Sequence, residues 1–296
     1  MIRIENVSKR FQRIDVLKAI DLDIARGDRV ALVGSNGAGK TTLIRCLLGE
    51  YHCTGNITID GLSPRQHRTR VLKRVGFVPQ ISPPLKMSVW QLIKFSSGVS
   101  DSDPQHMIGI AGELGLDVHS IRHKPFNKLS GGMKQKLLIS IALGRDCDLL
   151  VMDEPAANLD PEARHTFFRL LAARQQEAAM VISSHRLDEV AALVNRVVEL
   201  DQGEIVLNDH VADDIDMDSI LECRLTLTRP NSAFAETVRE WGFTDAGEGV
   251  IWLGQVSGPD RLRFLGVLSR YAALLKGIHL KETEETILEK PHANIA

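Results

Sequence analysis

The feature that most restricts the fold of this chain is the order of three short segments. A glycine-rich loop that ends in Lys40 and Thr41 comes first. The turn Leu129-Ser130-Gly131-Gly132-Met133 follows, and an apolar strand that ends in two carboxylates, residues 149–154, lies just after it. Many proteins contain the loop alone, but few place this turn shortly before this acidic strand. The order therefore favours a narrow group of α/β folds that bind phosphate groups.

The glycine-rich loop matches the pattern G-x-x-x-x-G-K-[ST] in full. An all-apolar strand over residues 30–33 precedes it, and a helix is expected from Lys40 to Leu48. Glycines let backbone N–H groups converge on phosphates, and the helix presents its positive end. Lys40 would pair with β- and γ-phosphate oxygens, and the Thr41 hydroxyl would ligate Mg²⁺. The expected nucleotide contacts of this loop are Gly34, Ser35, Asn36, Gly37, Ala38, Gly39, Lys40, Thr41 and Thr42.

The two carboxylates at the end of the acidic strand are Asp153 and Glu154. Successive strand residues point to opposite faces, so we expect the two to have different roles. Glu154 lies where a general base could activate an attacking water. The alternative is an acidic pair that merely faces solvent, which Pro155 and the turn at residues 158–160 disfavour.

With these segments in this order, residues 1 to about 207 resemble the cassette of ATP-binding-cassette (ABC) ATPases. The resemblance implies an α/β fold, in which a RecA-like phosphate-loop core carries an antiparallel β-subdomain and a helical subdomain. It implies ATP and Mg²⁺ as cofactors. In this family the turn of Ser130, Gly131 and Gly132 caps the nucleotide held by a second cassette, because small residues let N–H groups approach the γ-phosphate. We therefore expect a dimer, most simply a homodimer, that closes on ATP.

The resemblance also implies roles for five further residues. Asp153 would hold Mg²⁺, usually through water, and Gln80 would contact Mg²⁺ and water. His185 would contact the γ-phosphate and hold Glu154 in place, although a lone histidine is more often structural. Asp160 would lie at the dimer interface. Phe11 would stack on adenine, or would simply belong to the core.

The pattern of apolar residues predicts three regions after these motifs are placed. A cassette domain covers residues 1–207, with a helical subdomain at about 81–128 and a helix over 164–174. An acidic linker covers 208–219, and a small α+β accessory or regulatory domain covers 220–296. In the last domain we expect the order β-α-β-α-β, with strands near 223–227, 250–253 and 278–281 and helices over 232–241 and 260–273.

Composition excludes several classes of function. The 296 residues suggest about two domains. The formal net charge of −2 leaves no basic footprint, so no nucleic-acid partner is expected. A basic run over residues 65–74 reads as a solvated helix face or a contact with a partner or lipid headgroups. No uncharged apolar run approaches the ~20 residues that span a bilayer. We therefore expect a cytoplasmic chain that meets the membrane only through a partner.

The function implied by the resemblance is ATP hydrolysis that drives a separate transmembrane permease, docked on the helical insertion at about residues 85–125. The continuation Met133-Lys134-Gln135 is typical of exporters of the ABC-2 type. Three alternatives stay open: an importer ATPase, a soluble ABC protein that acts on nucleic acid or the ribosome, and a regulatory subunit without turnover.

Overall fold

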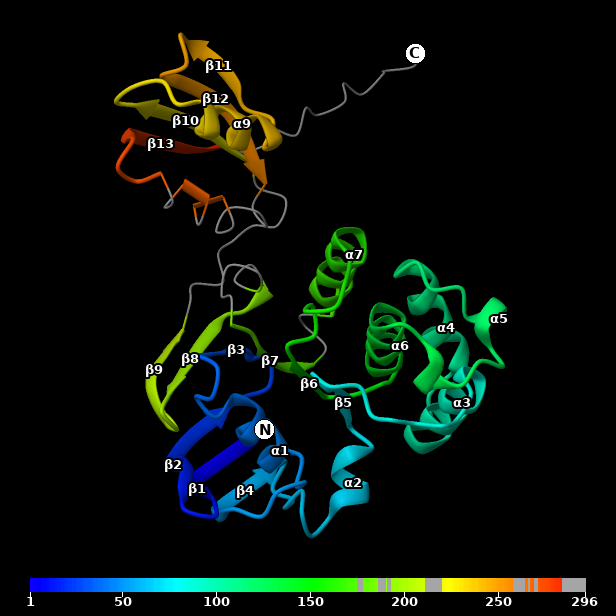
Figure 1. The fold of residues 1–296 in the computed structure, drawn as a ribbon. Helices are drawn as coiled ribbons and strands as arrows, with labels where there is room; N and C mark the ends of the chain where they lie inside the picture. Colours follow the sequence, from blue (N-terminus) through cyan, green and yellow to red (C-terminus); the bar gives the residue numbers. More distant parts are fainter. Residues whose placement is uncertain are drawn as a thin grey trace, which may run out of the picture. The chain divides into compact units, whose positions relative to one another are not determined.

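The structure is a computed structural model. It describes residues 1–174, 178–185, 190, 193–210, 220–257, 264, 265, 267, 268 and 271–283. The chain divides into two compact units, Met1–Val211 and Ala212–Ala296 (Figure 1).

A six-stranded sheet forms the centre of the first unit. Its strand order is β5-β6-β7-β3-β8-β9, and every pairing is parallel except that of β8 with β9. The bounds are β3 Arg29–Val33, β5 Val75–Val78, β6 Leu149–Asp153, β7 Ala179–Ser183, β8 Arg196–Asp201 and β9 Glu204–His210. All residues of β6 and β7 are buried, as expected for the continuous apolar runs of a sheet covered on both faces.

A second, antiparallel sheet has the order β2-β1-β4. Its strands are β1 Ile2–Phe11, β2 Ile14–Ile24 and β4 Thr54–Ile59. The alternating residues Ile2, Ile4 and Ile20 are buried, which is the pattern of a sheet with one covered face. This sheet corresponds to the predicted antiparallel β-subdomain.

The helices of the first unit fall into two groups. Those that flank the central sheet in sequence are α1 Lys40–Leu47, α2 Arg68–Leu72, α6 Gly131–Leu143 and α7 Pro161–Ala172. Those in the predicted helical insertion are α3 Val89–Ser100, α4 Pro104–Glu113, α5 Val118–Ile121 and the 3₁₀ helix η1 Phe126–Lys128. The insertion has its own core, in which Ile93, Met107 and Phe126 are fully buried and pack with Leu137 of α6. None of the helices in the described part of the chain combines the length and the apolar character that crossing a bilayer requires.

Two predicted boundaries in the first unit were wrong. Helix α7 begins at Pro161 rather than at residue 164, because Asp160 caps it by accepting a hydrogen bond from the Ala163 N–H at 2.9 Å. Strand β9 extends three residues into the predicted linker, to His210, because backbone pairing with β8 continues through polar residues. The Arg196 guanidinium also donates to the Asn208 side chain at 2.8 Å. Residues 211–219 of the linker lie outside the described residues.

The second unit contains a four-stranded antiparallel sheet with the order β11-β12-β10-β13. Its elements are β10 Ile220–Leu227, α9 Ser232–Glu240, β11 Thr244–Gly247, β12 Ile251–Ser257 and β13 Leu275–Thr283. Leu225, Phe234 and Trp252 are fully buried in one core. Most of the helix predicted over 260–273 lies outside the described residues, although Phe264 and Leu268 belong to this core.

The predicted order of the second unit omitted β11. Its sequence, Thr-Asp-Ala-Gly, has no apolar alternation, because this edge strand is exposed or half-buried throughout. Its pairing with β12 is decided by backbone hydrogen bonds and not by side-chain burial.

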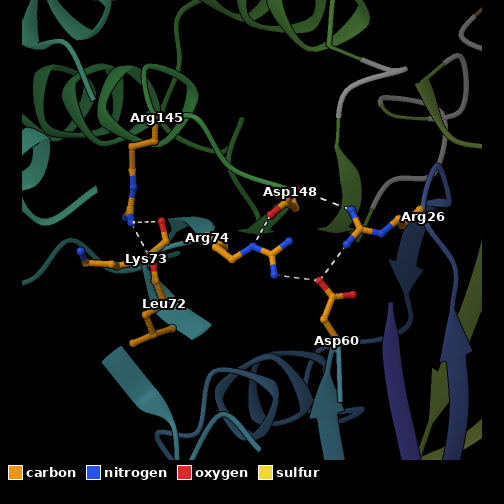
Figure 2. A network of polar contacts seen from close by, with 7 residues as sticks. All are labelled: Arg26, Asp60, Leu72, Lys73, Arg74, Arg145 and Asp148. Carbon is orange, nitrogen blue, oxygen red and sulfur yellow. Dashed lines mark hydrogen bonds and ion pairs between the residues drawn. The ribbon is translucent and has the colours of Figure 1, made fainter. Parts of the chain in front are cut away.

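A ring of four charged side chains joins the two sheets of the first unit (Figure 2). Arg26, after β2, contacts Asp60, after β4, at 2.9 Å, and Arg74, before β5, contacts the same carboxylate at 3.1 Å. Asp148, before β6, contacts both arginines. Part of the predicted basic run therefore has a structural role, since Arg74 belongs to it.

Replacing Asp148 with asparagine is expected to lower the free energy of unfolding by about 1 kcal/mol, because one carboxylate serves two partly exposed arginines. Urea unfolding would measure it. The matched control is Asp15→Asn, which removes a single exposed ion pair with Arg10 and should change stability by less than about 0.5 kcal/mol. Equal effects of the two substitutions would contradict a special role for the ring.

Candidate active site

The predicted site residues gather at the carboxyl ends of the parallel strands. The phosphate loop follows β3, Gln80 follows β5, Asp153 ends β6, and His185 follows β7. Ligands of open α/β sheets bind at this edge. The strand order therefore brings together residues that lie up to 150 positions apart in the sequence.

The phosphate loop requires glycine where the chain passes close to neighbouring backbone. Gly34 has a φ of +144°, and a Cβ there would lie 2.2 Å from the Leu200 carbonyl oxygen. Gly39 has a φ of +113°, and its Cβ would lie 2.9 Å from the Val16 carbonyl oxygen. The loop is thereby held against the end of β8 and against β2. Its backbone geometry is not available to residues with side chains.

Lys40 is buried at the start of α1. Its ammonium donates hydrogen bonds to the carbonyl oxygens of Gly34 and Ser35 at 2.7 and 3.1 Å. Helix α1 has no side-chain cap and no acidic residue in its first turn, so Thr41 and Thr42 lie at an uncapped positive helix end. A buried cation next to free helix N–H groups is suited to a phosphate chain.

Asp153 is buried at the end of β6, where its Oδ1 accepts a hydrogen bond from the Ser183 hydroxyl at 2.6 Å. The same hydroxyl oxygen accepts a hydrogen bond from the Glu154 N–H at 3.0 Å. Ser183 therefore orients both acidic residues. A carboxylate held in this way at the sheet edge provides the oxygen donors that Mg²⁺ prefers.

Strand alternation had been expected to set the direction of the Glu154 side chain, but it does not. Glu154 lies just beyond β6 and has a φ of +47°, a left-handed conformation that is strained for a residue with a side chain. Its Oε2 lies 3.6 Å from His185 Nδ1. The Glu154 side chain is 13% exposed and that of His185 is 52% exposed, so an enclosed carboxylate faces an accessible imidazole.

His185 lines two neighbouring hollows. One, of about 430 Å³, is also lined by Gly34, Ser35 and Asn36. The other, of about 180 Å³, is also lined by Glu154. His185 thus connects the phosphate loop to Glu154, which is the arrangement that γ-phosphate recognition beside a general base requires.

The turn that begins α6 does not line either hollow. Ser130 caps the helix by accepting a hydrogen bond from the Met133 N–H at 3.3 Å, and Ser130 and Gly131 are exposed. Asp160 is also exposed, and its carboxylate contacts the Lys136 ammonium of α6 at 2.8 Å. Lys136 and the Ala163 N–H hold the pKa of Asp160 below its usual value. These residues form a surface of their own beside the site.

Gln80 and Phe11 are both accessible. Gln80 is exposed two residues after β5, at the same sheet edge as Asp153. The Phe11 ring is 37% exposed, packs edge to face on Tyr51 with centroids 5.3 Å apart, and lies 4.6 Å from the Lys9 ammonium. The Phe11 ring is therefore partly packed and partly accessible, and it matches neither a core position nor a fully exposed one.

Two residues that sequence reasoning missed are Ser183 and Gln135. Gln135 is buried in α6 and donates a hydrogen bond to the Pro155 carbonyl oxygen at 2.8 Å. A serine that ends an apolar strand and a glutamine inside a helix are too common to stand out. Only their partners identify them.

Comparison with known proteins gives one consistent result. Residues 17–157 match the family model described as ABC transporter. The chain is 34% identical to the zinc import ATP-binding protein ZnuC of Marinobacter nauticus, over 68% of this chain and 75% of that protein. It is 28% identical to the linearmycin resistance ATP-binding protein LnrL of Bacillus subtilis, over 81% of this chain and 79% of that protein.

Other relatives are much longer. The chain is 31% identical to the mouse organic anion transporter ABCA8B over 69% of its own residues, but it spans only 13% of that protein. Among solved structures, an ATP-binding subunit of an ABC transporter aligns with a TM-score of 0.66 and 23% identity, over 73% of this chain and 91% of that one. The fold class predicted from the sequence, a phosphate-loop cassette, is confirmed.

Proposed function

This chain belongs to the ABC transporter family and contains its ATPase domain, and from that premise we propose that it drives a separate membrane-spanning permease by binding and hydrolysing ATP. In this proposal ATP and Mg²⁺ occupy the edge of the central sheet. Lys40 and the loop would hold the phosphates, while Thr41, Asp153 and Gln80 would hold the metal. Glu154 acts as general base.

The observation that carries this proposal is that His185 lines both hollows, beside the loop residues Gly34–Asn36 in one and beside Glu154 in the other. A γ-phosphate held by the loop would meet His185, and the attacking water would lie next to Glu154. The intact pair argues against a regulatory subunit without turnover.

The exposed turn of Ser130 and Gly131 supports a dimer. These residues do not line either hollow of their own chain. They are small and exposed to solvent at the N-terminus of α6. A second copy in head-to-tail orientation would bring this turn onto the nucleotide of its partner and complete each site.

The permease is proposed to dock on the helical insertion. Phe95 and Val99, one turn apart on α3, are 60% and 39% exposed, and Ile81, next to Gln80, is 74% exposed. Contiguous exposed apolar patches mark contact sites, whereas single exposed apolar residues are ordinary, so the support comes from Phe95 and Val99 being neighbours on one helix face. Gln80 would link this surface to the nucleotide site. The chain itself would then lie on the cytoplasmic side of the membrane.

Export is the direction that we favour. The match to the linearmycin resistance protein covers 81% of this 296-residue chain, more than the 211 residues of the first unit, so it reaches into the accessory unit. The Met133-Lys134-Gln135 continuation points the same way. The alternative is import, because the match to the zinc import protein has the higher identity.

The experiment that tests the proposal is co-purification from membranes of the source organism in mild detergent. We expect the tagged chain to retain a polytopic membrane protein, and Phe95→Asp to reduce its recovery about tenfold, because a charge on a buried contact costs more than 1.4 kcal/mol. The matched control is Ile14→Asp, an isoleucine that is 70% exposed at the start of β2 and should retain the permease.

Recovery of soluble proteins or nucleic acid alone would contradict the proposal. The sequence of a recovered permease would separate export from import. Equal recovery of the permease with both variants would show that the docking surface does not include α3. It would not affect the assignment of the chain as an ATPase.

A further inference from the structure

Helix α6 holds the loop between β6 and α7 at three points on one face. A Cβ on Gly132 would lie 3.3 Å from the Asn158 carbonyl oxygen, so the two backbones are in contact. Gln135 donates to the Pro155 carbonyl oxygen, and Lys136 contacts Asp160. Positions 132, 135 and 136 have the three- and four-residue spacing of a single helix face. Helix α6, capped by Ser130, and the loop that begins at Glu154 are therefore held together.

The Gln135 contact is the most constrained of the three. The residue is 1% exposed, and its neighbours in α6, Leu137 and Ile139, are fully buried. Its Oε1 is buried and makes no hydrogen bond among the described residues. A methionine would fill a similar volume without the unmet Oε1, but it would leave the Pro155 carbonyl without this donor. The amide therefore contributes the bond to the Pro155 carbonyl at the cost of one unmet acceptor.

Glu154 and Pro155 are held at both ends. The Glu154 N–H donates to the backbone carbonyl and the hydroxyl of Ser183 at 3.2 and 3.0 Å. At the other end, Gln135 binds the Pro155 carbonyl at 2.8 Å. Between these contacts Glu154 keeps its left-handed φ of +47°, which persists only where the surroundings over-determine it. The contact made by Gln135 therefore helps to aim the Glu154 carboxylate toward His185.

We propose that Gln135 is a positioning residue for Glu154. The inference rests on the proposed function. By holding the Pro155 carbonyl against α6, Gln135 keeps the Glu154 carboxylate directed toward His185 and the attacking water.

The test is steady-state ATP hydrolysis by the purified full chain carrying Gln135→Met. We expect kcat to fall about 10- to 100-fold, because a small misplacement of a general base has effects of this size. The affinity of the chain for a fluorescent ATP analogue should stay unchanged. Ser140→Ala is the matched control, since it removes a buried hydroxyl of the same helix that donates to the Lys136 carbonyl and not to the loop.

A double-variant cycle distinguishes positioning from a general loss of structure. If Gln135 acts through Glu154, adding Gln135→Met to Glu154→Gln should not lower turnover further, whereas independent effects would multiply. Lys136→Met breaks the neighbouring contact with Asp160 at a less buried position. It provides a second measurement if the Gln135 variant does not fold, because it loosens the same loop and should also lower kcat.

Unchanged kcat in a folded Gln135 variant, or multiplying effects in the cycle, would overturn the inference. Absence of ATP hydrolysis by the wild-type chain would instead count against the proposed function. The two failures are therefore distinguishable.

Discussion

Replacing Glu154 with glutamine is expected to reduce ATP turnover by about 100- to 10,000-fold while leaving ATP binding intact. Glutamine has the same length and fits the left-handed backbone no worse than glutamate, but its amide cannot accept the proton of the attacking water. The carboxylate lies 3.6 Å from His185 in an enclosed position. Among the described residues, no other carboxylate lines the hollow beside Glu154 and His185, so none can replace it.

The measurement is ATP hydrolysis combined with size-exclusion chromatography in ATP and Mg²⁺. In the presence of ATP the variant should elute as a dimer. Without nucleotide it should elute like the wild type, because closure of the dimer depends on ATP binding and its reopening on hydrolysis. The control is Glu162→Gln, which makes the same chemical change at an exposed position in the first turn of α7. Normal turnover by the Glu154 variant would remove Glu154 from its proposed role.

Replacing Lys40 with methionine is expected to weaken ATP binding about 100-fold or more. The ammonium is buried, and charge-assisted hydrogen bonds to phosphate oxygens are roughly twice as strong as neutral ones. A loss of about 3 kcal/mol corresponds to two powers of ten in the dissociation constant. The substitution also removes the bonds to the Gly34 and Ser35 carbonyls that close the loop.

Titration with a fluorescent ATP analogue measures this effect directly. Lys18→Met is the matched control, since Lys18 is a partly exposed lysine that pairs with Glu204 outside the site. Tight nucleotide binding by the Lys40 variant would contradict the assignment of the loop. Together, the Lys40 and Glu154 variants separate binding from turnover, which a general loss of structure would not do.

Local sequence patterns were sufficient for most of the first unit. The apolar runs at residues 30–33 and 149–152 lie in the central strands β3 and β6, because strands buried on both faces are rich in apolar residues. The helix predicted after the phosphate loop formed as α1. Edge and terminal features were predicted less well. Strand β11 and the end of β9 are polar, and backbone pairing alone decides them.

The chemical groups of the site could be predicted from local sequence, because the phosphate loop, the acidic strand end and the small-residue turn are contiguous motifs. Their mutual arrangement depends on contacts between distant segments. The Ser183 hydroxyl between the two acidic residues and the Gln135 contact to Pro155 each join segments about 20 to 30 residues apart, and between them Glu154 adopts its left-handed conformation. Such contacts leave no periodic pattern in the sequence, because they depend on strand order and on the packing of α6 against the loop and not on local preference.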